Sequence, residues 1–393
     1  MDANLFRTHS LQDERILRIL SAALNAVEPG KIVHDFLTTK ILPPHKRIFL
    51  LGIGKAAEPM TLAAADILTG FAEALIVTKH ASFPTRERLT VIEAGHPIPD
   101  ERSFAAGQAA LNFVSRLDED DLLICLISGG GSALVTAPKE GITLADIQSR
   151  TAELLASGAT INEINSLRQQ LDHIKGGGLV RATKAKVVSL ILSDVIGNSL
   201  ETIASGLTVE PSLGTRVQNF IVGDIQVAAE AAKNQAMVEG FESEILNLQV
   251  QGEAREVGIS FAKKLKEKRR KGKDKFCLIA GGETTVTLRL RSGQASGKGG
   301  RNQELALSAI DELNGVENVL FISLATDGDD GPTNAAGAVV NGESRQRAEK
   351  LGMFAPDYLS RNDAYSFFDP LGDLIKCGYT GTNVNDLLFL IGL

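Results

Sequence analysis

Short apolar runs rich in β-branched residues alternate along this chain with longer stretches of helical periodicity. The apolar runs carry little polar alternation, which is typical of strands buried on both faces. They lie at residues 47–51, 74–78, 90–93, 122–127, 187–192, 219–222, 276–280 and 319–324. Helical stretches span residues 56–68, 103–115, 144–156, 161–174, 226–239 and 254–268. We therefore expect an α/β protein whose mostly parallel sheets lie between layers of helices.

The chain of 393 residues is too long for one ordinary core, and about 150 residues per domain predicts two domains. A turn-rich segment at residues 210–215 precedes a new strand and helix, so the predicted domains are residues 1–212 and 213–393. An alternative boundary lies in the basic run at residues 263–275.

Composition narrows the class of protein. A net charge of -7 argues against a general nucleic-acid binder, and the basic run at residues 263–275 has no aromatic residues for base stacking. No apolar run reaches about 18 residues, and the N-terminus is polar where a signal peptide would be apolar, so we expect a cytoplasmic protein without a membrane partner. The three cysteines read as buried thiols, and the scattered histidines disfavour a zinc hydrolase.

The first candidate site follows the strand at residues 47–51. Ligands of parallel sheets bind at the carboxyl ends of strands, and Gly52-Ile-Gly54-Lys55-Ala-Ala57 follows this one. Its spacing fits a dinucleotide fingerprint, but the next strand ends in Lys79-His80 rather than in the acid that would hold a ribose. We predict an anion contact by Gly54 and Lys55; a simple tight turn is the alternative.

A second candidate follows the strand at residues 122–127, and it consists of Ser128, Gly129, Gly130, Gly131 and Ser132. Consecutive glycines cost conformational entropy, so a role other than stability is indicated. Their backbone amides and the two hydroxyl groups could hold phosphate. Close packing under a neighbouring element is the alternative.

Three acids also stand at strand ends, namely Asp194, Glu283 after Gly282, and Asp327. Carboxylates placed in this way can hold magnesium or accept a hydroxyl proton. Each alone would more often be a turn or helix-capping acid. Together with cations and glycine loops, however, they are the parts that phosphoryl transfer needs.

Two further segments carry cations beside glycines. Residues 296–304 place Lys298 and Arg301 just before a helical run, where backbone amides and a helix dipole favour an anion, although a solvated surface turn would look the same. Arg168 and Lys175 are seven residues apart, which predicts one helical face near a glycine-rich helix end. Cations there could instead simply favour the helix dipole.

Taken in order, these segments resemble the glycerate 2-kinase family, in its class II branch with a C-terminal MOFRL-type domain. The matching segments are residues 52–57, 128–134 with 140–143, 155–162, 174–177, 192–195, 203–206, 281–284, 299–304, 326–333 and 380–386. The resemblance implies phosphorylation of D-glycerate by ATP and Mg²⁺, usually to 2-phosphoglycerate. It also implies a larger Rossmann-like three-layer domain and a smaller α/β domain, with the active site in the cleft between them.

Carried over to this chain, the resemblance implies that Lys55 and Arg301 are catalytic cations, and that Asp194, Glu283 or Asp327 organises magnesium or the attacking hydroxyl. The loop of residues 128–132, with Lys175 and Gly282, is expected to bind the nucleotide. The chain departs from the family pattern at Gln170, Gly178, Leu207, Asn334 and Ser366. These departures put substrate preference in question more than reaction class.

Two other functions stay open. A hydroxypyruvate reductase would use residues 52–57 for NAD(P)H, and a non-catalytic sugar-phosphate or nucleotide-binding regulator would need no strand-end acids. The sequence also leaves open whether two copies form a homodimer.

Overall fold

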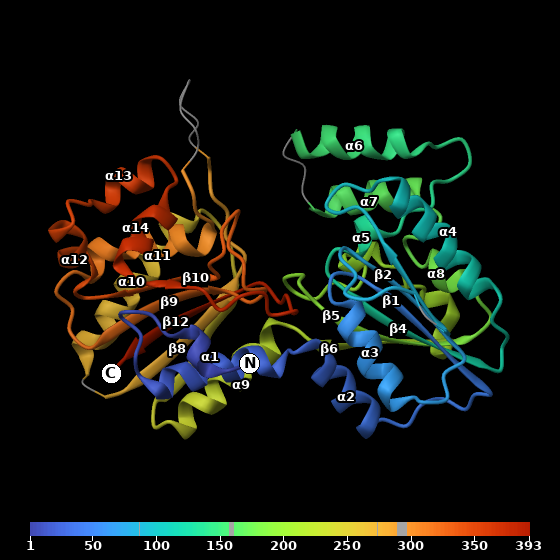
Figure 1. Ribbon diagram of the computed structural model, residues 1–393, viewed down its shortest axis with the longest axis horizontal. Helices are drawn as coiled ribbons and strands as arrows, with labels where there is room; N and C mark the ends of the chain where they lie inside the picture. Colours follow the sequence, from blue (N-terminus) through green and yellow to red (C-terminus); the bar gives the residue numbers. More distant parts are fainter. Residues whose placement is uncertain (86, 157–160, 273, 289–296) are drawn as a thin grey trace. The chain divides into compact units, whose positions relative to one another are not determined.

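A computed structural model of the chain describes residues 1–85, 87–156, 161–272, 274–288 and 297–393. The chain forms two compact units. Glu28–Asp224 is called the parallel-sheet unit below, and Met1–Val27 together with Ile225–Leu393 is called the mixed-sheet unit. Figure 1 colours both by position in the sequence. Ser296 of the predicted anion segment, and residues 157–160 of the family resemblance, lie outside the described residues.

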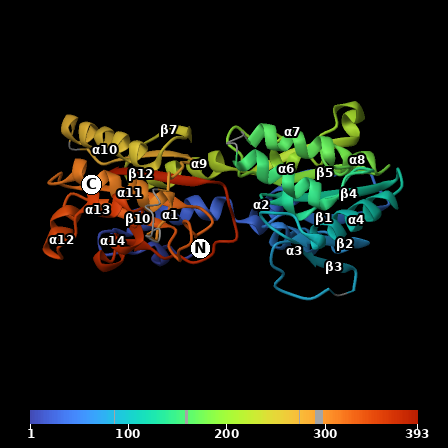
Figure 2. The same cartoon turned by 90° about the horizontal axis from the view of Figure 1, so that it is seen from above.

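The parallel-sheet unit is built on six strands, and every neighbouring pair is parallel. They are β1 (Arg47–Ile53), β2 (Glu73–Thr78), β3 (Leu89–Glu93), β4 (Asp121–Ser128), β5 (Lys186–Leu192) and β6 (Val217–Gly223). The order in the sheet is β3-β2-β1-β4-β5-β6, most of which can be followed in Figure 2. This is the order of doubly wound nucleotide-binding folds, whose ligands bind where the order reverses, beyond the ends of β1 and β4.

Helices cover both faces of this sheet. They are α2 (Pro29–Thr39), α3 (Ala57–Ile67), α4 (Glu101–Ser115), α5 (Gly131–Leu134), α6 (Leu144–Ala156), α7 (Ile161–Leu171) and α8 (Gly178–Arg181). The start of α4 is fixed by a capping box, in which Asp100 accepts the amide of Ser103 and the Ser103 hydroxyl accepts the amide of Asp100. Apolar side chains of α4 pack on β1 and β2 to form the core on that face, whereas α3 packs on the other side of β1. The predicted Rossmann-like architecture is confirmed.

The mixed-sheet unit contains a second sheet of six strands. They are β7 (Glu242–Val250), β8 (Phe276–Gly282), β9 (Val319–Ala325), β10 (Gly337–Asn341), β11 (Leu374–Ile375) and β12 (Asp386–Gly392), in the order β11-β10-β9-β12-β8-β7. Only β7 and β8 pair in parallel; the other neighbours are antiparallel. The expectation of mostly parallel sheets is therefore wrong for this unit. Its central strands are buried along their whole length, so their hydrophobic pattern does not reveal their direction.

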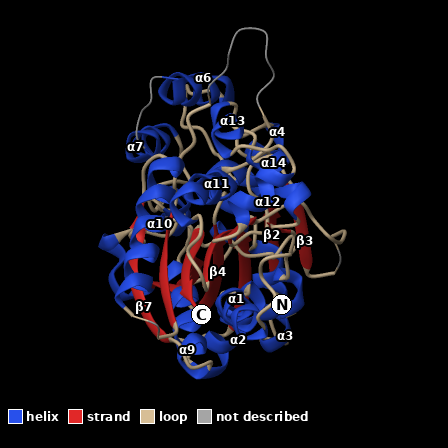
Figure 3. Ribbon diagram, turned by 90° about the vertical axis from the view of Figure 1, so that its left-hand side faces the viewer, coloured by secondary structure: helices blue, strands red, loops and turns tan. Residues whose placement is uncertain are grey.

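Two helical layers enclose the second sheet (Figure 3). α1 (Glu14–Ala26) packs on α9 (Ile225–Val238) at one face, and α10 (Ala254–Lys271) packs on α11 (Arg301–Leu313) at the other. The short helices α12 (Ser344–Lys350), α13 (Ala355–Ser360) and α14 (Ala364–Leu371) complete the unit. All three cysteines are buried and free, as predicted. Among the described residues, no helix combines the length and the apolar character that a membrane span requires.

The two units differ from the predicted domains at both ends of the parallel-sheet unit. Strand β6 lies beyond the predicted boundary after residue 212, yet its pairing with β5 places it in the parallel sheet. The first 27 residues belong to the mixed-sheet unit, where the Ser10 amide donates to the buried carboxylate of Asp373 over 2.7 Å. Neither contact has a signal in local sequence pattern, because each joins segments far apart in the chain.

Close packing of α10 against α11 predicts a stability effect at Gly258. A Cβ added there would lie 2.1 Å from Ser308 Oγ and 2.2 Å from the Leu305 carbonyl oxygen, so the helices would have to separate. We expect Gly258→Ala to destabilise this unit by about 1–3 kcal/mol, as overpacked cores do. Gly272→Ala, at the open end of the same helix, is the control and should change stability by less than about 0.5 kcal/mol. Calorimetric unfolding of both variants checks this; equal stabilities would contradict the packing argument.

Candidate active site

The loops that follow β1 and β4 are joined at the switch point of the parallel sheet. The Lys55 amide donates to the Gly129 carbonyl over 2.9 Å, and the Ala56 amide donates to Ser128 Oγ over 2.9 Å. Gly54 has a φ of 137°, and a Cβ on it would lie 2.2 Å from Ser128 Oγ. Only glycine fits at this approach. The two glycine-rich segments singled out in the sequence therefore form one structure.

Asp194, just beyond β5, lies against the same loop. A Cβ on Gly129 would lie 1.9 Å from its Oδ2 atom, so the carboxylate occupies the space that a side chain would need. Gly130 has a φ of 85° and opens α5, where Gly131 is buried. Lys55, the loop and Asp194 are thus gathered in one place, as the strand-end rule predicts.

His96 belongs to this group but was not predicted. A Cβ on Gly130 would lie 3.0 Å from His96 Cδ2 and 3.2 Å from Lys55 Cγ. Burial, together with the positive charges of Lys55, Lys79 and Arg168, lowers the pKa of His96 to about 4, so the imidazole is neutral at neutral pH. The strand-end rule that indicated Lys55 and Asp194 could also have indicated His96, because His96 is a polar residue that closely follows β3.

Lys175 is placed differently from its predicted contact with the nucleotide. It is 2% exposed, and its ammonium donates to the carbonyl oxygens of Ser132 and Val135 over 2.7 and 2.6 Å. Burial lowers its pKa to about 8, with the Asp172 carboxylate opposing the shift and Arg168 adding to it. The ammonium therefore holds the loop of residues 128–132 in place. Lys175 does not share a helical face with Arg168, because α7 ends at Leu171.

The mixed-sheet unit has a pocket of about 1240 Å³. Among the described residues, its lining combines one cation with several acids and glycines, which include Glu283, Gly297, Gly299, Gly300, Arg301, Glu304, Asp327, Asp329 and Asp330. Lys298 is not part of this lining: its ammonium lies 3.8 Å from the centre of the Tyr365 ring. Of the two cations predicted for residues 296–304, Arg301 is therefore the one at the pocket.

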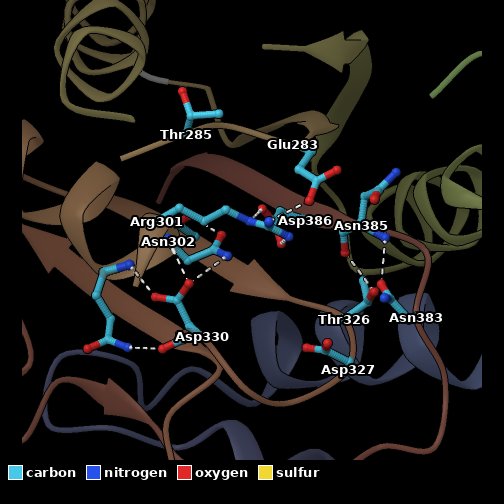
Figure 4. Close-up of polar contacts among 12 residues, drawn as sticks. Glu283, Thr285, Arg301, Asn302, Thr326, Asp327, Asp330, Asn383, Asn385 and Asp386 are labelled. Carbon is cyan, nitrogen blue, oxygen red and sulfur yellow. Dashed lines mark hydrogen bonds and ion pairs between the residues drawn. The ribbon is translucent and has the colours of Figure 1, made fainter. Parts of the chain in front are cut away.

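Arg301 is held by two carboxylates, as Figure 4 shows. Its Nε and Nη2 atoms donate to the two oxygens of Asp386 over 2.5 and 3.2 Å, and Nη1 donates to Glu283 over 2.5 Å. Burial opposes the charge of the guanidinium, but the two carboxylates outweigh it and raise the pKa of Arg301. The sequence pattern pointed to Arg301 and Glu283 but gave Asp386, the first residue of β12, no role.

Asp330 fixes the start of α11 and with it the base of the Arg301 side chain. Its buried carboxylate accepts the amide of Asn302 over 3.0 Å (Figure 4) and the amide of Gln303 over 2.8 Å. The N-cap of α11 is Gly300, where a Cβ would lie 2.3 Å from Asp330 Cγ. Burial raises the pKa of Asp330 to about 7, against the amides that favour its charge. The strand-end rule pointed to Asp327, which is nearer to the end of β9, and gave Asp330 no separate role.

Asp327 and Gly282 are the other residues of this unit that the sequence indicated, and they differ in whether they line the pocket. Asp327 lines the pocket, and its Oδ1 atom accepts the Asp329 amide over 3.2 Å. Gly282 has a φ of 151°, and a Cβ on it would lie 2.2 Å from the Val250 carbonyl, so tight strand packing accounts for this glycine without a nucleotide contact.

The predicted magnesium ligands are Asp194, Glu283 and Asp327. Among the described residues, no group of three His, Cys, Asp or Glu side chains has the arrangement of a metal site. Magnesium usually takes one or two carboxylates together with substrate phosphates and water, and Glu283 and Asp327, which line the same pocket, each carry oxygen donors of this kind. Asp194 lies in the parallel-sheet unit.

Family models match most of the chain. A domain of unknown function, DUF4147, matches residues 15–237, and the MOFRL family matches residues 276–386. D-glycerate 2-kinase of Thermotoga maritima is 38% identical, over 96% of this chain and 97% of that protein. A protein of Agrobacterium vitis named putative hydroxypyruvate reductase is 36% identical, over 95% of this chain and 93% of its own length.

A solved structure is also similar. The crystal structure of glycerate kinase from Thermotoga maritima has a TM-score of 0.88 and 37% identity, over 96% of this chain and 98% of that one. By sequence, domain order and fold, the chain belongs to the family of glycerate 2-kinases that join a DUF4147 domain to a C-terminal MOFRL domain.

Proposed function

We propose that this chain transfers the γ-phosphoryl group of ATP to D-glycerate in the presence of Mg²⁺, giving 2-phosphoglycerate and ADP. The observation that carries the proposal is the placement of the predicted residues. Lys55, the glycine loop and Asp194 meet at the switch point of the parallel sheet, and Arg301 stands with Glu283 and Asp327 at the pocket of the mixed-sheet unit. Each unit thus offers a cation beside acids and backbone amides.

Each group has a role that its surroundings support. Asp194 would accept the proton of the attacking hydroxyl while the new oxygen–phosphorus bond forms and the bond to ADP breaks. The Lys55 and Arg301 cations would offset the negative charge of the transferred group, with amides of residues 128–132 donating to phosphate oxygens. Lys175 keeps that loop in shape. Glu283 and Asp327 would hold Mg²⁺, which neutralises phosphate charge when bound.

The reductase alternative is less well supported. A dinucleotide site needs an acid at the end of the strand next to β1, to hold the ribose hydroxyls. That strand is β2, and the exposed residue that follows it is Lys79. We further infer a cytoplasmic enzyme that acts on small molecules and not on nucleic acid, in line with its net charge of -7.

The first test identifies the reaction and its product. Purified protein with D-glycerate, ATP and Mg²⁺ should form ADP only when glycerate is present, and ³¹P NMR should show 2-phosphoglycerate. A second reaction with hydroxypyruvate and NADPH serves as the comparison. Oxidation of NADPH without consumption of ATP would overturn the proposal, and a product of 3-phosphoglycerate would overturn its regiochemistry.

Replacement of Lys55 tests the cation of the parallel-sheet unit. Lys55→Ala should lower kcat by about a hundredfold or more, because a charge partner of the transition state is lost. Lys31→Ala is the matched control: Lys31 is an exposed lysine of the same unit that pairs with Asp35, and its loss should leave kcat unchanged. Turnover of Lys55→Ala close to that of Lys31→Ala would remove Lys55 from the mechanism.

Replacement of Arg301 tests the paired guanidinium. Arg301→Lys keeps a positive charge near Asp386 but loses the fork that contacts two carboxylates, so kcat should fall by about a hundredfold while the fold is retained. Arg345→Lys, on the surface of the same unit, should behave as wild type. Steady-state kinetics with circular dichroism as the folding check decide between these outcomes. Wild-type kinetics in Arg301→Lys would show that only the charge matters.

A further inference from the structure

Arg168, near the end of α7, has no carboxylate partner among the residues that the structure describes. Its Nη1 atom donates to Ser132 Oγ over 3.0 Å, and this is the one hydrogen bond of the Arg168 side chain to the residues that the structure describes. A favourable charge acts on it from Asp172, but that carboxylate is taken by Thr136 Oγ1 at 2.6 Å and by the amides of Ala137 and Ile174. A partly buried cation left in this state costs stability unless a ligand supplies the missing anion.

The contact that holds Arg168 is itself part of a polar network. Ser132 Oγ lies 2.6 Å from Ser205 Oγ, and the Ser205 hydroxyl donates to the buried Asn165 over 2.9 Å. Ala204 and Ser205 have φ values of 49° and 57°, in the left-handed region that side chains avoid. Such residues are strained and are found mostly at functional sites. The network fixes one nitrogen of the guanidinium.

Other cations surround the same place. The positive charges of Lys55, Lys79 and Arg168 all act on His96, which stays neutral. Two other arginines show how the chain normally satisfies this side chain. Arg216 donates to three backbone carbonyls at 2.7, 3.0 and 2.9 Å, and Arg301 is bound by two carboxylates. Within the described part of the chain Arg168 has neither arrangement, so this part of the parallel-sheet unit is suited to a small anion.

We propose that Arg168 binds the carboxylate of D-glycerate through the guanidinium nitrogens that Ser132 leaves free. This inference rests on the proposed function and names the residue that selects an acid as the phosphoryl acceptor. In glycerate the 2-hydroxyl is on the carbon next to the carboxylate, so its carboxylate site must lie close to the proton acceptor. Asp194 lies against Gly129, which belongs to the same loop as Ser132, so the proton acceptor and the proposed carboxylate site share that loop. A planar fork matches a carboxylate better than an ammonium does.

Binding measurements on Arg168→Gln test the inference. We expect calorimetry to show D-glycerate binding weakened about 10- to 100-fold, because a hydrogen bond between charged groups contributes about 1.5–3 kcal/mol. The affinity for ATP should change less than twofold. In kinetic assays the KM for D-glycerate should rise by a similar factor. The preference of the wild type for D-glycerate over its uncharged amide should largely disappear in the variant.

Arg216→Gln is the matched control from the same unit. Because Arg216 joins three carbonyls, its loss should lower the melting temperature and leave the affinity for glycerate unchanged. Arg168→Gln should melt at or above the wild-type temperature, since an unpaired cation is removed. A purely structural role of Arg168 would predict the opposite, a fall in melting temperature like that of Arg216→Gln.

Three results would overturn the inference. The first is an unchanged affinity of Arg168→Gln for D-glycerate. The second is a variant that loses affinity for ATP or inorganic phosphate but keeps its affinity for D-glycerate. The third is a variant that loses stability and binds neither D-glycerate nor ATP. A wild type that binds D-glycerate without phosphorylating it would refute the proposed function while leaving the Arg168 site supported. A wild type that shows no binding of D-glycerate would refute the site.

Discussion

The pairing of Arg301 with Asp386 is the interaction on which the candidate site of the mixed-sheet unit depends. A guanidinium and a carboxylate removed from water lose hydration, and good geometry is needed to offset that loss. Here two nitrogens of Arg301 face the two oxygens of Asp386. Asp386 stands on β12, between β8 and β9, and the α11 start that carries Arg301 is capped by Asp330. The cation is therefore held by rigid elements on both sides.

The two units carry opposite electrostatic surroundings. The pocket of the mixed-sheet unit has several acids, and its arginine is paired with two of them. The loops of the parallel-sheet unit gather Lys55, Lys79 and Arg168 around a neutral histidine. A small carboxylic acid suits the surroundings of Arg168 in the second environment. This contrast between the units follows from the partners of Arg301 and Arg168, and it does not depend on the net charge of the chain.

Much of this could be predicted from the sequence. All eight predicted strands are present, because short apolar runs rich in β-branched residues are a strong local signal. The strand-end rule brought Lys55, Gly129 and Asp194 together correctly. The missing strands include β12, an apolar run at the end of the chain, and β7, whose burial alternates irregularly. The antiparallel pairing of the second sheet could not be predicted, since direction depends on contacts between distant segments.

The differences between the predicted and the observed partners of several residues have a common cause. Lys175 looks like an anion-binding cation in the sequence, yet two carbonyl oxygens take up its ammonium. Asp330 and Asp386 stand in acid-containing motifs, but only the fold shows that one caps α11 and the other pairs with Arg301. Residue type and spacing indicate which groups can act; the partner of each group is decided by tertiary packing.

A double-mutant cycle on Arg301 and Asp386 tests the central claim most directly, because it isolates the coupling between two residues. If Asp386 acts only by holding the guanidinium, Asp386→Asn should lower kcat about tenfold or more in the wild-type background. The same substitution should lower kcat no further in Arg301→Lys. If the two losses instead multiply, Asp386 acts independently of Arg301, and the dependence of the site on their pairing is contradicted.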